Sequence, residues 1–132
     1  MSMTDPIANM LTMIRNATSR KKDTVDIPAS KVCQAILEIF KVDGYIDNFR
    51  LVEDSKQGML RVYLKYLDKK KPAIKNLKRV SKPGSRVYAK KGKIPTVLNG
   101  YGTAVISTSK GIMDDRQARE QNIGGEIVCM VW

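Results

Sequence analysis

Apolar and polar residues follow two different spacings in the first half of the chain. Residues 6–20 place an apolar side chain at every third or fourth position, which predicts a helix, and Thr4 and Asp5 suit its N-terminus. The same spacing predicts a second helix, with Ser30 as its cap and Gly44 as its left-handed stop. Apolar and polar residues alternate in three shorter segments, which predicts strands at 24–27, 45–53 and 59–67.

The predicted elements shorten after Asp68-Lys69-Lys70-Lys71-Pro72, a charged segment that ends in proline. This composition predicts a boundary between two lobes, 1–67 and 68–132. Further strands are predicted in the second lobe at 73–80, 85–89, 102–106 and 126–132. The fold class is therefore α+β. An N-terminal α-β-α-β-β lobe, with two helices on one side of a small sheet, precedes a mainly antiparallel β lobe with short helices.

Turn residues separate the predicted strands of the second lobe. Pro83 and Gly84 are placed for a type II turn within residues 81–84. Residues 95–99 predict one helical turn closed by Gly100, and Asp114 can cap a brief helix that runs through Gln121. Each lobe has only about 65 residues, so we expect their stability to depend on a shared interface.

The charge of the chain is concentrated in its second half. The sequence has 24 basic and 13 acidic residues and a formal charge of +11, and no acid occurs between Lys69 and Met113. A run of one sign costs self-repulsion, which a polyanion would offset. Nucleic acid is therefore a better prediction for the partner than an unspecific charged surface.

Several other classes of protein are disfavoured. The chain has no histidine, paired-carboxylate signature, phosphate loop or dinucleotide fingerprint, and Ser109 beside Lys110 has no third orienting group, so we expect neither an enzyme nor a cofactor or metal. Cys33 and Cys129 lie in apolar segments, which favours free buried thiols in a reducing compartment. No apolar run reaches the ~20 residues that span a bilayer, and no signal or transit pattern opens the sequence. The strongest basic run lies in predicted strands and turns, which argues against a membrane-surface helix.

A compact polar segment follows the apolar run that ends at Ile106. Ser107, Thr108 and Ser109 are followed by Lys110 and Gly111, and we call residues 107–111 the hydroxyl tip. Hydroxyl groups beside a lysine and a glycine can approach a sugar-phosphate backbone closely. Most such segments are only turns, so the tip points to RNA only because of the basic charge that precedes it.

Several motifs together resemble one family, small-subunit ribosomal protein eight of the bacterial or organellar type, and the resemblance covers nearly the whole chain. Those near the C-terminus are the most specific: a Ser-Lys-Pro-Gly turn, the Ser-Thr-Ser-Lys-Gly tip and a Gly-Gly-Glu. The full set is Thr4-Asp5-Pro6-Ile7-Ala8, Ile14-Arg15-Asn16-Ala17, Pro28-Ala29-Ser30-Lys31, Arg79-Val80-Ser81-Lys82-Pro83-Gly84, Arg86-Val87-Tyr88, Ser107-Thr108-Ser109-Lys110-Gly111 and Gly124-Gly125-Glu126. The chain departs from the family's usual residues at Asn9, Met13, Ser85, Tyr101, Thr103 and Asp114.

The resemblance implies a structural constituent of the small ribosomal subunit. Such a protein binds a central-domain helix of small-subunit ribosomal RNA and helps to assemble the platform. Its other implied partners are ribosomal proteins five and twelve, and some members bind their own messenger and repress its translation. A chain of this kind is monomeric off the ribosome, has no small-molecule substrate and works on ribosomes of the cytoplasm, or of an organelle if encoded there.

The resemblance also implies the RNA-binding residues, which belong mainly to the C-terminal lobe. They are Arg86, Tyr88, Ser107, Thr108, Ser109, Lys110, Gly111, Gly124, Gly125 and Glu126. A lesser contact is expected from loops that carry Ser30, Lys31 and Lys56, and diffuse attraction from Lys90, Lys91 and Lys93. We expect hydroxyls to contact sugars and base edges and Tyr88 to stack on a base. Glu126 has two open interpretations, an anchor for the preceding loop through its backbone amides and a contact to a base amino group.

Overall fold

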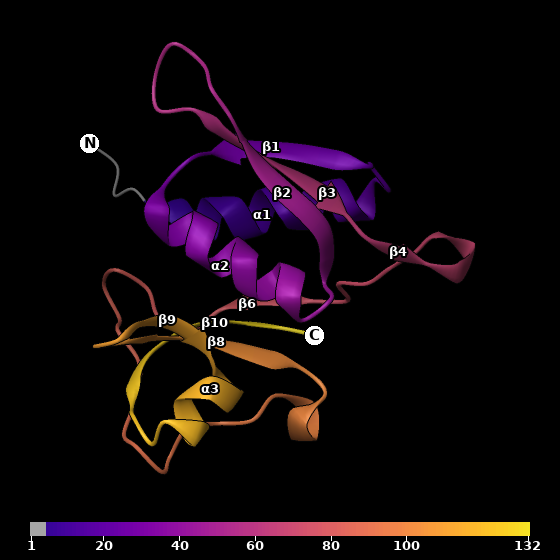
Figure 1. Cartoon of the computed structure of the whole chain (residues 1–132). Coiled ribbons are helices and arrows are strands. Elements are labelled where there is room, and N and C mark those ends of the chain that lie inside the picture. The colour runs from indigo at the N-terminus through magenta and orange to yellow at the C-terminus, as the bar shows by residue number, and fades with distance from the viewer. Residues whose placement is uncertain (1–4) are drawn as a thin grey trace. The chain divides into compact units, whose positions relative to one another are not determined.

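The computed structural model describes residues 5–132 and is an α+β protein with antiparallel sheets, as predicted (Figure 1). The chain separates into two compact units, one up to Lys75 and the other from Asn76 to Trp132. The division falls later than residue 67, where charge and proline placed it. The reason is that β5 (Lys71–Pro72) turns back to pair with β4 (Tyr66–Leu67) and so stays with the first unit.

Both helices of the first unit begin at a polar side chain that caps them. In α1 (Pro6–Ser19) the Asp5 carboxylate accepts a hydrogen bond of 3.2 Å from the Ala8 amide, whereas Thr4 lies outside the described residues. In α2 (Lys31–Val42) the Ser30 hydroxyl accepts one of 3.2 Å from the Cys33 amide. Gly44 follows α2 with a φ of 84°, the left-handed stop that the sequence predicted.

The sheet of the first unit has the strand order β1-β3-β2 and is antiparallel throughout. It consists of β1 (Thr24–Pro28), β2 (Ile46–Val52) and β3 (Met59–Leu64). Leu60, Val62 and Leu64 alternate with more exposed residues and are buried, because both helices lie on that face of the sheet (Figure 1). The predicted strand 59–67 is interrupted at Lys65, after which β4 begins a separate ladder.

The second unit is organised around its last strand, β10, which pairs with β6, β7 and β8. Strand β9 pairs with β8, and this short strand was not predicted. The bounds are β6 (Leu77–Arg79), β7 (Tyr88–Ala89), β8 (Thr103–Thr108), β9 (Gly111–Asp114) and β10 (Gly125–Val131).

One face of this second sheet forms a hydrophobic core with α3 (Asp115–Glu120). Ile106 lies opposite Met113 on one side and Ile127 on the other, and all three are buried. Asp114 caps α3 in a reciprocal capping box with Gln117, as its sequence position predicted.

Asp115 holds α3 to the sheet. Its carboxylate is 1 % exposed, accepts a hydrogen bond of 3.2 Å from the Ala104 amide and pairs with Arg119 at 2.8 Å. A buried carboxylate is stable only when it is paired and hydrogen-bonded. Arg119 of the same helix pairs with its charge, and the hydrogen bond from Ala104 fixes the helix against β8.

Two strands of the second unit are shorter than the sequence predicted. Only Leu77–Arg79 of the predicted strand 73–80 forms strand β6, and only Tyr88–Ala89 of the predicted strand 85–89 forms strand β7. The second is shortened because the amide of Val87 donates to the hydroxyl of Ser81 (3.1 Å). That amide is therefore not used in a sheet ladder.

Two turns also differ from prediction. The turn at Pro83 and Gly84 is present, closed by paired Lys82 and Ser85, but Gly84 lacks the positive φ that a type II turn requires. The helical turn expected at 95–99 is instead a 3-10 element, η2 (Leu98–Gly100), in which Leu98 and Asn99 have φ values of 48° and 55°. A right-handed helix cannot include such residues.

Three residues of the second unit that differ from the family's usual pattern differ in exposure. Ser85 and Tyr101 are exposed, so the core does not depend on them. Thr103 is 1 % exposed at the start of β8.

Candidate nucleic-acid interface

Three predicted RNA-binding residues form a row across three neighbouring strands. Glu126 on β10 lies directly opposite Tyr88 on β7 and Ser107 on β8. Residues directly opposite each other in antiparallel strands present their side chains on the same face. Since Ile106 and Ile127 are their neighbours in sequence and face the core, this row faces away from it. The structure therefore brings together residues separated by up to 38 positions in the sequence (Tyr88 to Glu126).

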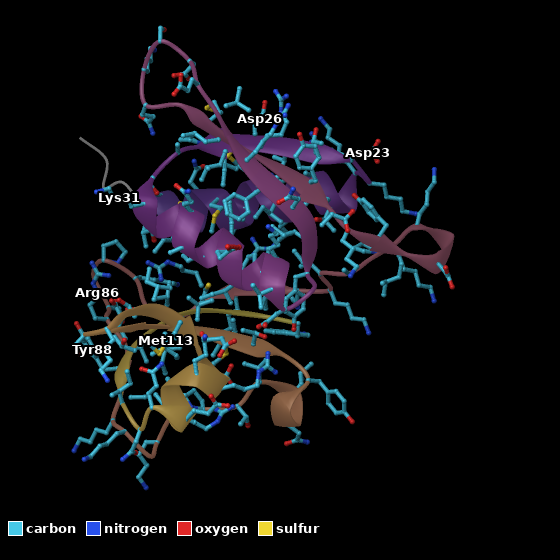
Figure 2. All side chains as sticks on the ribbon, in the orientation of Figure 1. Asp23, Asp26, Lys31, Arg86, Tyr88 and Met113 are labelled. Carbon is cyan, nitrogen blue, oxygen red and sulfur yellow. The ribbon has the colours of Figure 1, made fainter. Side chains whose placement is uncertain are left out.

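Tyr88 is the most exposed member of this row. Its side chain is 69 % exposed, although strand β7 holds its backbone beside Glu126. Arg86 and Tyr88 lie toward the same edge of the second unit (Figure 2). An aromatic ring fixed at its backbone and open to solvent can stack on an unpaired base without displacing another side chain.

The hydroxyl tip is the hairpin between β8 and β9. Thr108 and Gly111 are opposite each other, so Ser109 and Lys110 form the two-residue loop and are exposed. Gly111 has a φ of 113°, which a residue with a side chain rarely adopts. The sequence placed all five residues in one tip, and the structure divides them between two strand ends and a loop.

Thr108 has a structural task within this hairpin. Its hydroxyl donates to the carbonyl of Gly111 (2.8 Å) and accepts from the amide of Lys110 (3.1 Å). Its donor is thus already used, whereas Ser109 stands at the exposed end of the loop. Of the three hydroxyl residues, Ser109 is the most accessible to a partner.

Glu126 anchors a loop through side chains. Its Oε2 accepts hydrogen bonds from the hydroxyl of Ser81 (2.5 Å) and from Nη1 of Arg86 (2.9 Å). Although partial burial raises the pKa of Glu126, the hydrogen bonds from Ser81 and Arg86 and the charge of Arg79 bring that pKa below its ordinary value. The carboxylate is therefore ionised and locally neutralised.

Ser81 lies within a family motif but was not predicted to belong to the site. It is fully buried, donates to Glu126 and accepts from the Val87 amide, so it joins β10 to the segment that carries Arg86 and Tyr88. No local pattern could have revealed this link, because its partner lies 45 residues away.

Gly124 and Gly125 allow main-chain segments to approach each other closely. A Cβ on Gly124 would lie 2.4 Å from the carbonyl oxygen of Ala89, and one on Gly125 would lie 2.3 Å from that of Ser107. Such distances are far inside van der Waals contact with main-chain atoms that cannot rotate away. The pair lets β10 begin between β7 and β8, which brings Tyr88 and Ser107 to either side of Glu126.

The remaining predicted contacts lie in two other places. Lys90, Lys91 and Lys93 are exposed in the turn after β7, where Gly92 has a φ of 78°. In the first unit, the Gln57 side chain donates to the Ala29 carbonyl (3.1 Å), which places the loop of Lys56 beside the turn that precedes Ser30 and Lys31. Lys31 and Lys56 are exposed, whereas Ser30 caps α2.

Residues 5–132, the described part of the chain, also bear on metal binding, membrane insertion and thiol chemistry. No cluster of three or more metal-binding side chains is present in this part of the chain. None of its helices is long and apolar enough to cross a membrane. Cys33 and Cys129 are both buried free thiols, as predicted, and burial raises the pKa of Cys33 despite a hydrogen bond from Ser30.

The chain matches a known protein family. Residues 5–132 match the family model described as ribosomal protein S8. The chain belongs to this family. It is 54% identical over 132 residues to small ribosomal subunit protein uS8 of Geobacter metallireducens and 58% identical over 132 residues to that of Desulforamulus reducens, with full coverage of both chains. It is 58% identical over 130 residues to that of Moorella thermoacetica, covering 98% of this chain and all of the relative.

Family membership confirms the resemblance seen in the motifs. The chain is a structural constituent of the small ribosomal subunit and is not an enzyme. It is ribosome-bound and associates with ribosomal RNA and other ribosomal proteins. The candidate RNA-binding surface consists of the row of Tyr88, Glu126 and Ser107 and the adjoining hydroxyl tip.

Proposed function

We propose that this chain binds an irregular helix in the central domain of small-subunit ribosomal RNA and helps to assemble the platform of the subunit. The observation that carries the proposal is the alignment of Tyr88, Glu126 and Ser107 on the face of the sheet turned away from the core, beside the hydroxyl tip. This face combines a stacking ring, hydroxyl groups and an exposed lysine. A-form RNA presents 2′-hydroxyls and base edges in a wide, shallow minor groove, which suits such a surface.

Each side chain has a role set by its environment. Ser109 contacts sugar hydroxyls or base edges, since its hydroxyl stands at the exposed loop, and Lys110 contacts a phosphate. Tyr88 stacks on a base that the irregular helix leaves unpaired.

Glu126 acts mainly as an anchor. Its Oε2 already accepts from the side chains of Ser81 and Arg86, which disfavours a base contact. The segment that it anchors is therefore 81–86 and not the preceding loop, whose backbone amides the sequence suggested. Thr108, Gly111, Gly124 and Gly125 shape the backbone around these groups.

The wider proposal follows the family. Ribosomal proteins five and twelve are the proposed neighbours, the cytoplasm is the proposed compartment, and binding to its own messenger is a proposed second use of the same face. Lys31 and Lys56 form a lesser contact, and Lys90, Lys91 and Lys93 add diffuse attraction because they are exposed.

Filter binding tests this proposal. The full-length protein is titrated with the central-domain helix and with a scrambled duplex of equal length at moderate salt. A preference of about a thousandfold or more for the helix is expected of a specific complex. Equal affinity for the two RNAs would refute the proposal.

A further inference from the structure

A second basic surface lies in the first unit, where α1 ends and the β4–β5 hairpin extends away from the three-stranded sheet (Figure 1). Segments 20–23 and 66–72 contain six basic and two acidic residues. We call their exposed cations the hairpin patch: Arg20, Lys21, Lys22, Lys70 and Lys71. None of them belongs to the RNA-binding residues discussed above.

A hydrogen bond joins the two segments, and a second one joins the first segment to the end of β3. The hydroxyl of Tyr66 donates to the carbonyl of Lys22 (2.5 Å), and the amide of Leu64 donates to the carbonyl of Asp23 (2.9 Å). Between the segments is a hollow of about 210 Å³ lined by Lys21, Asp23, Tyr66 and Lys70. The lysines at its rim therefore stand on anchored backbone.

Both lysines of the hollow occupy backbone positions that favour glycine. Lys21 and Lys70 have φ values of 55° and 58°. The Lys21 amide bonds to the Thr18 carbonyl and the Lys22 amide to the Ala17 carbonyl, which is the helix-ending motif in which glycine is usual at the position of Lys21. A left-handed non-glycine residue costs on the order of 1 kcal/mol. Both lysines line the same hollow despite this cost.

The chemistry of the patch fits a phosphate group better than a protein surface. Interfaces between proteins have apolar centres and are depleted in lysine, and Leu67 is the large apolar side chain exposed within these two segments. Lysine and arginine supply the contacts to nucleic-acid phosphates. Asp23 and Asp68 reduce the charge only in part.

We infer that the hairpin patch is a second RNA-binding site, which holds a backbone phosphate of small-subunit ribosomal RNA between Lys21 and Lys70. This inference rests on the proposed function, because it assigns a second segment of the same RNA to the first unit. The second site reads no sequence and instead fixes how the first unit lies on the RNA.

Two double variants of the full-length protein test the inference. Lys21→Gln with Lys70→Gln removes the two ammonium groups of the hollow. Lys41→Gln with Arg50→Gln removes the same charge from exposed positions of α2 and β2, outside the patch. Each variant is titrated at several salt concentrations against the isolated central-domain helix and against whole small-subunit ribosomal RNA.

Both double variants should bind the isolated helix with an affinity within about twofold of that of the unmodified protein. The reason is that this helix is bound mainly by the second unit, which neither variant changes. On whole ribosomal RNA, the patch variant should lower the magnitude of the salt slope of log Kobs by about 1, since one phosphate contact is lost, and the control should change it by much less. Hydroxyl-radical footprinting should show one block of protection, outside the central-domain helix, that the patch variant alone loses.

Equal behaviour of the two variants on whole RNA would overturn the inference while leaving the proposed function intact. A patch variant that keeps every RNA protection would also overturn it. Failure of the unmodified protein to bind the isolated helix more tightly than the scrambled duplex of the filter-binding test would refute the proposed function itself.

Discussion

The hydroxyl of Ser81 donates a hydrogen bond of 2.5 Å to the carboxylate of Glu126, although 45 residues separate them. Because Ser81 also accepts from the Val87 amide, this one hydroxyl ties the last strand to the segment that presents Arg86 and Tyr88. The proposed RNA-binding face is therefore positioned by a buried serine that cannot itself reach the RNA. Residues that position this face and residues that contact the RNA are therefore different residues.

Ser109→Ala should weaken binding to the central-domain helix by about 1–3 kcal/mol and leave binding to a scrambled duplex nearly unchanged. The reason is that its exposed hydroxyl contacts sugars or base edges rather than phosphate. Filter binding with both RNAs measures the two losses. Ser19→Ala, which removes an exposed hydroxyl at the end of α1, is the matched control, and equal losses on the two RNAs would count against a specific role for Ser109.

Tyr88→Leu should weaken binding to the same helix by about 1–3 kcal/mol, whereas Tyr88→Phe should retain most of the affinity. Phenylalanine keeps the ring that stacks and loses only the hydroxyl. The side chain is 69 % exposed, so thermal unfolding of both variants should stay close to that of the unmodified protein. A large loss for Tyr88→Phe would mean that the hydroxyl, and not stacking, makes the contact.

Gly124→Ala should destabilise the second unit by about 1–3 kcal/mol or prevent it from folding, because the added Cβ would lie 2.4 Å from the Ala89 carbonyl. Gly84→Ala is the control, since its Cβ would meet no atom within 4 Å and its φ is not positive. Denaturant unfolding followed by fluorescence of Trp132, the single tryptophan, reports this unit. Equal stability of the two variants would show that the glycine is not needed for close approach.

The stability of the second unit should depend on the charge of Glu126. The pKa of Glu126 is below its ordinary value of 4.5, so its interactions stabilise the unit fully above that pH and are lost as the pH falls through the lower folded pKa. Glu126→Gln should therefore be destabilising near pH 7, with a difference from the unmodified protein that shrinks below about pH 4.5. Glu120→Gln, at an exposed position of α3, is the control, and a difference independent of pH would contradict the ionic anchor.

The first unit was largely predictable because its signals are local. Asp5 and Ser30 cap their helices next to the apolar stripes that they begin, and alternation along β3 places Leu60 and Val62 on the buried face. The second unit depends more on distant partners. Strand β9 has only four residues directly after the hydroxyl tip, so its pairing with β8 has no independent periodic signal.

The sequence predicted which residues belong to the candidate site, but it did not predict how they are arranged. Its exposed residues, such as Tyr88 and Ser109, come from the family resemblance. The buried support of Ser81 and the row that Glu126 completes depend on strand pairing, which a single sequence does not specify. The left-handed lysines of the hairpin patch also escaped sequence analysis, because lysine gives no sign of a positive φ.

The most direct test of the account is a hydroxyl-radical footprint of the full-length protein on small-subunit ribosomal RNA at moderate ionic strength. The account predicts strong protection of one irregular central-domain helix, which Ser109→Ala and Tyr88→Leu weaken at that helix alone. Diffuse protection without preference for that helix, or a footprint that neither substitution changes, would contradict it.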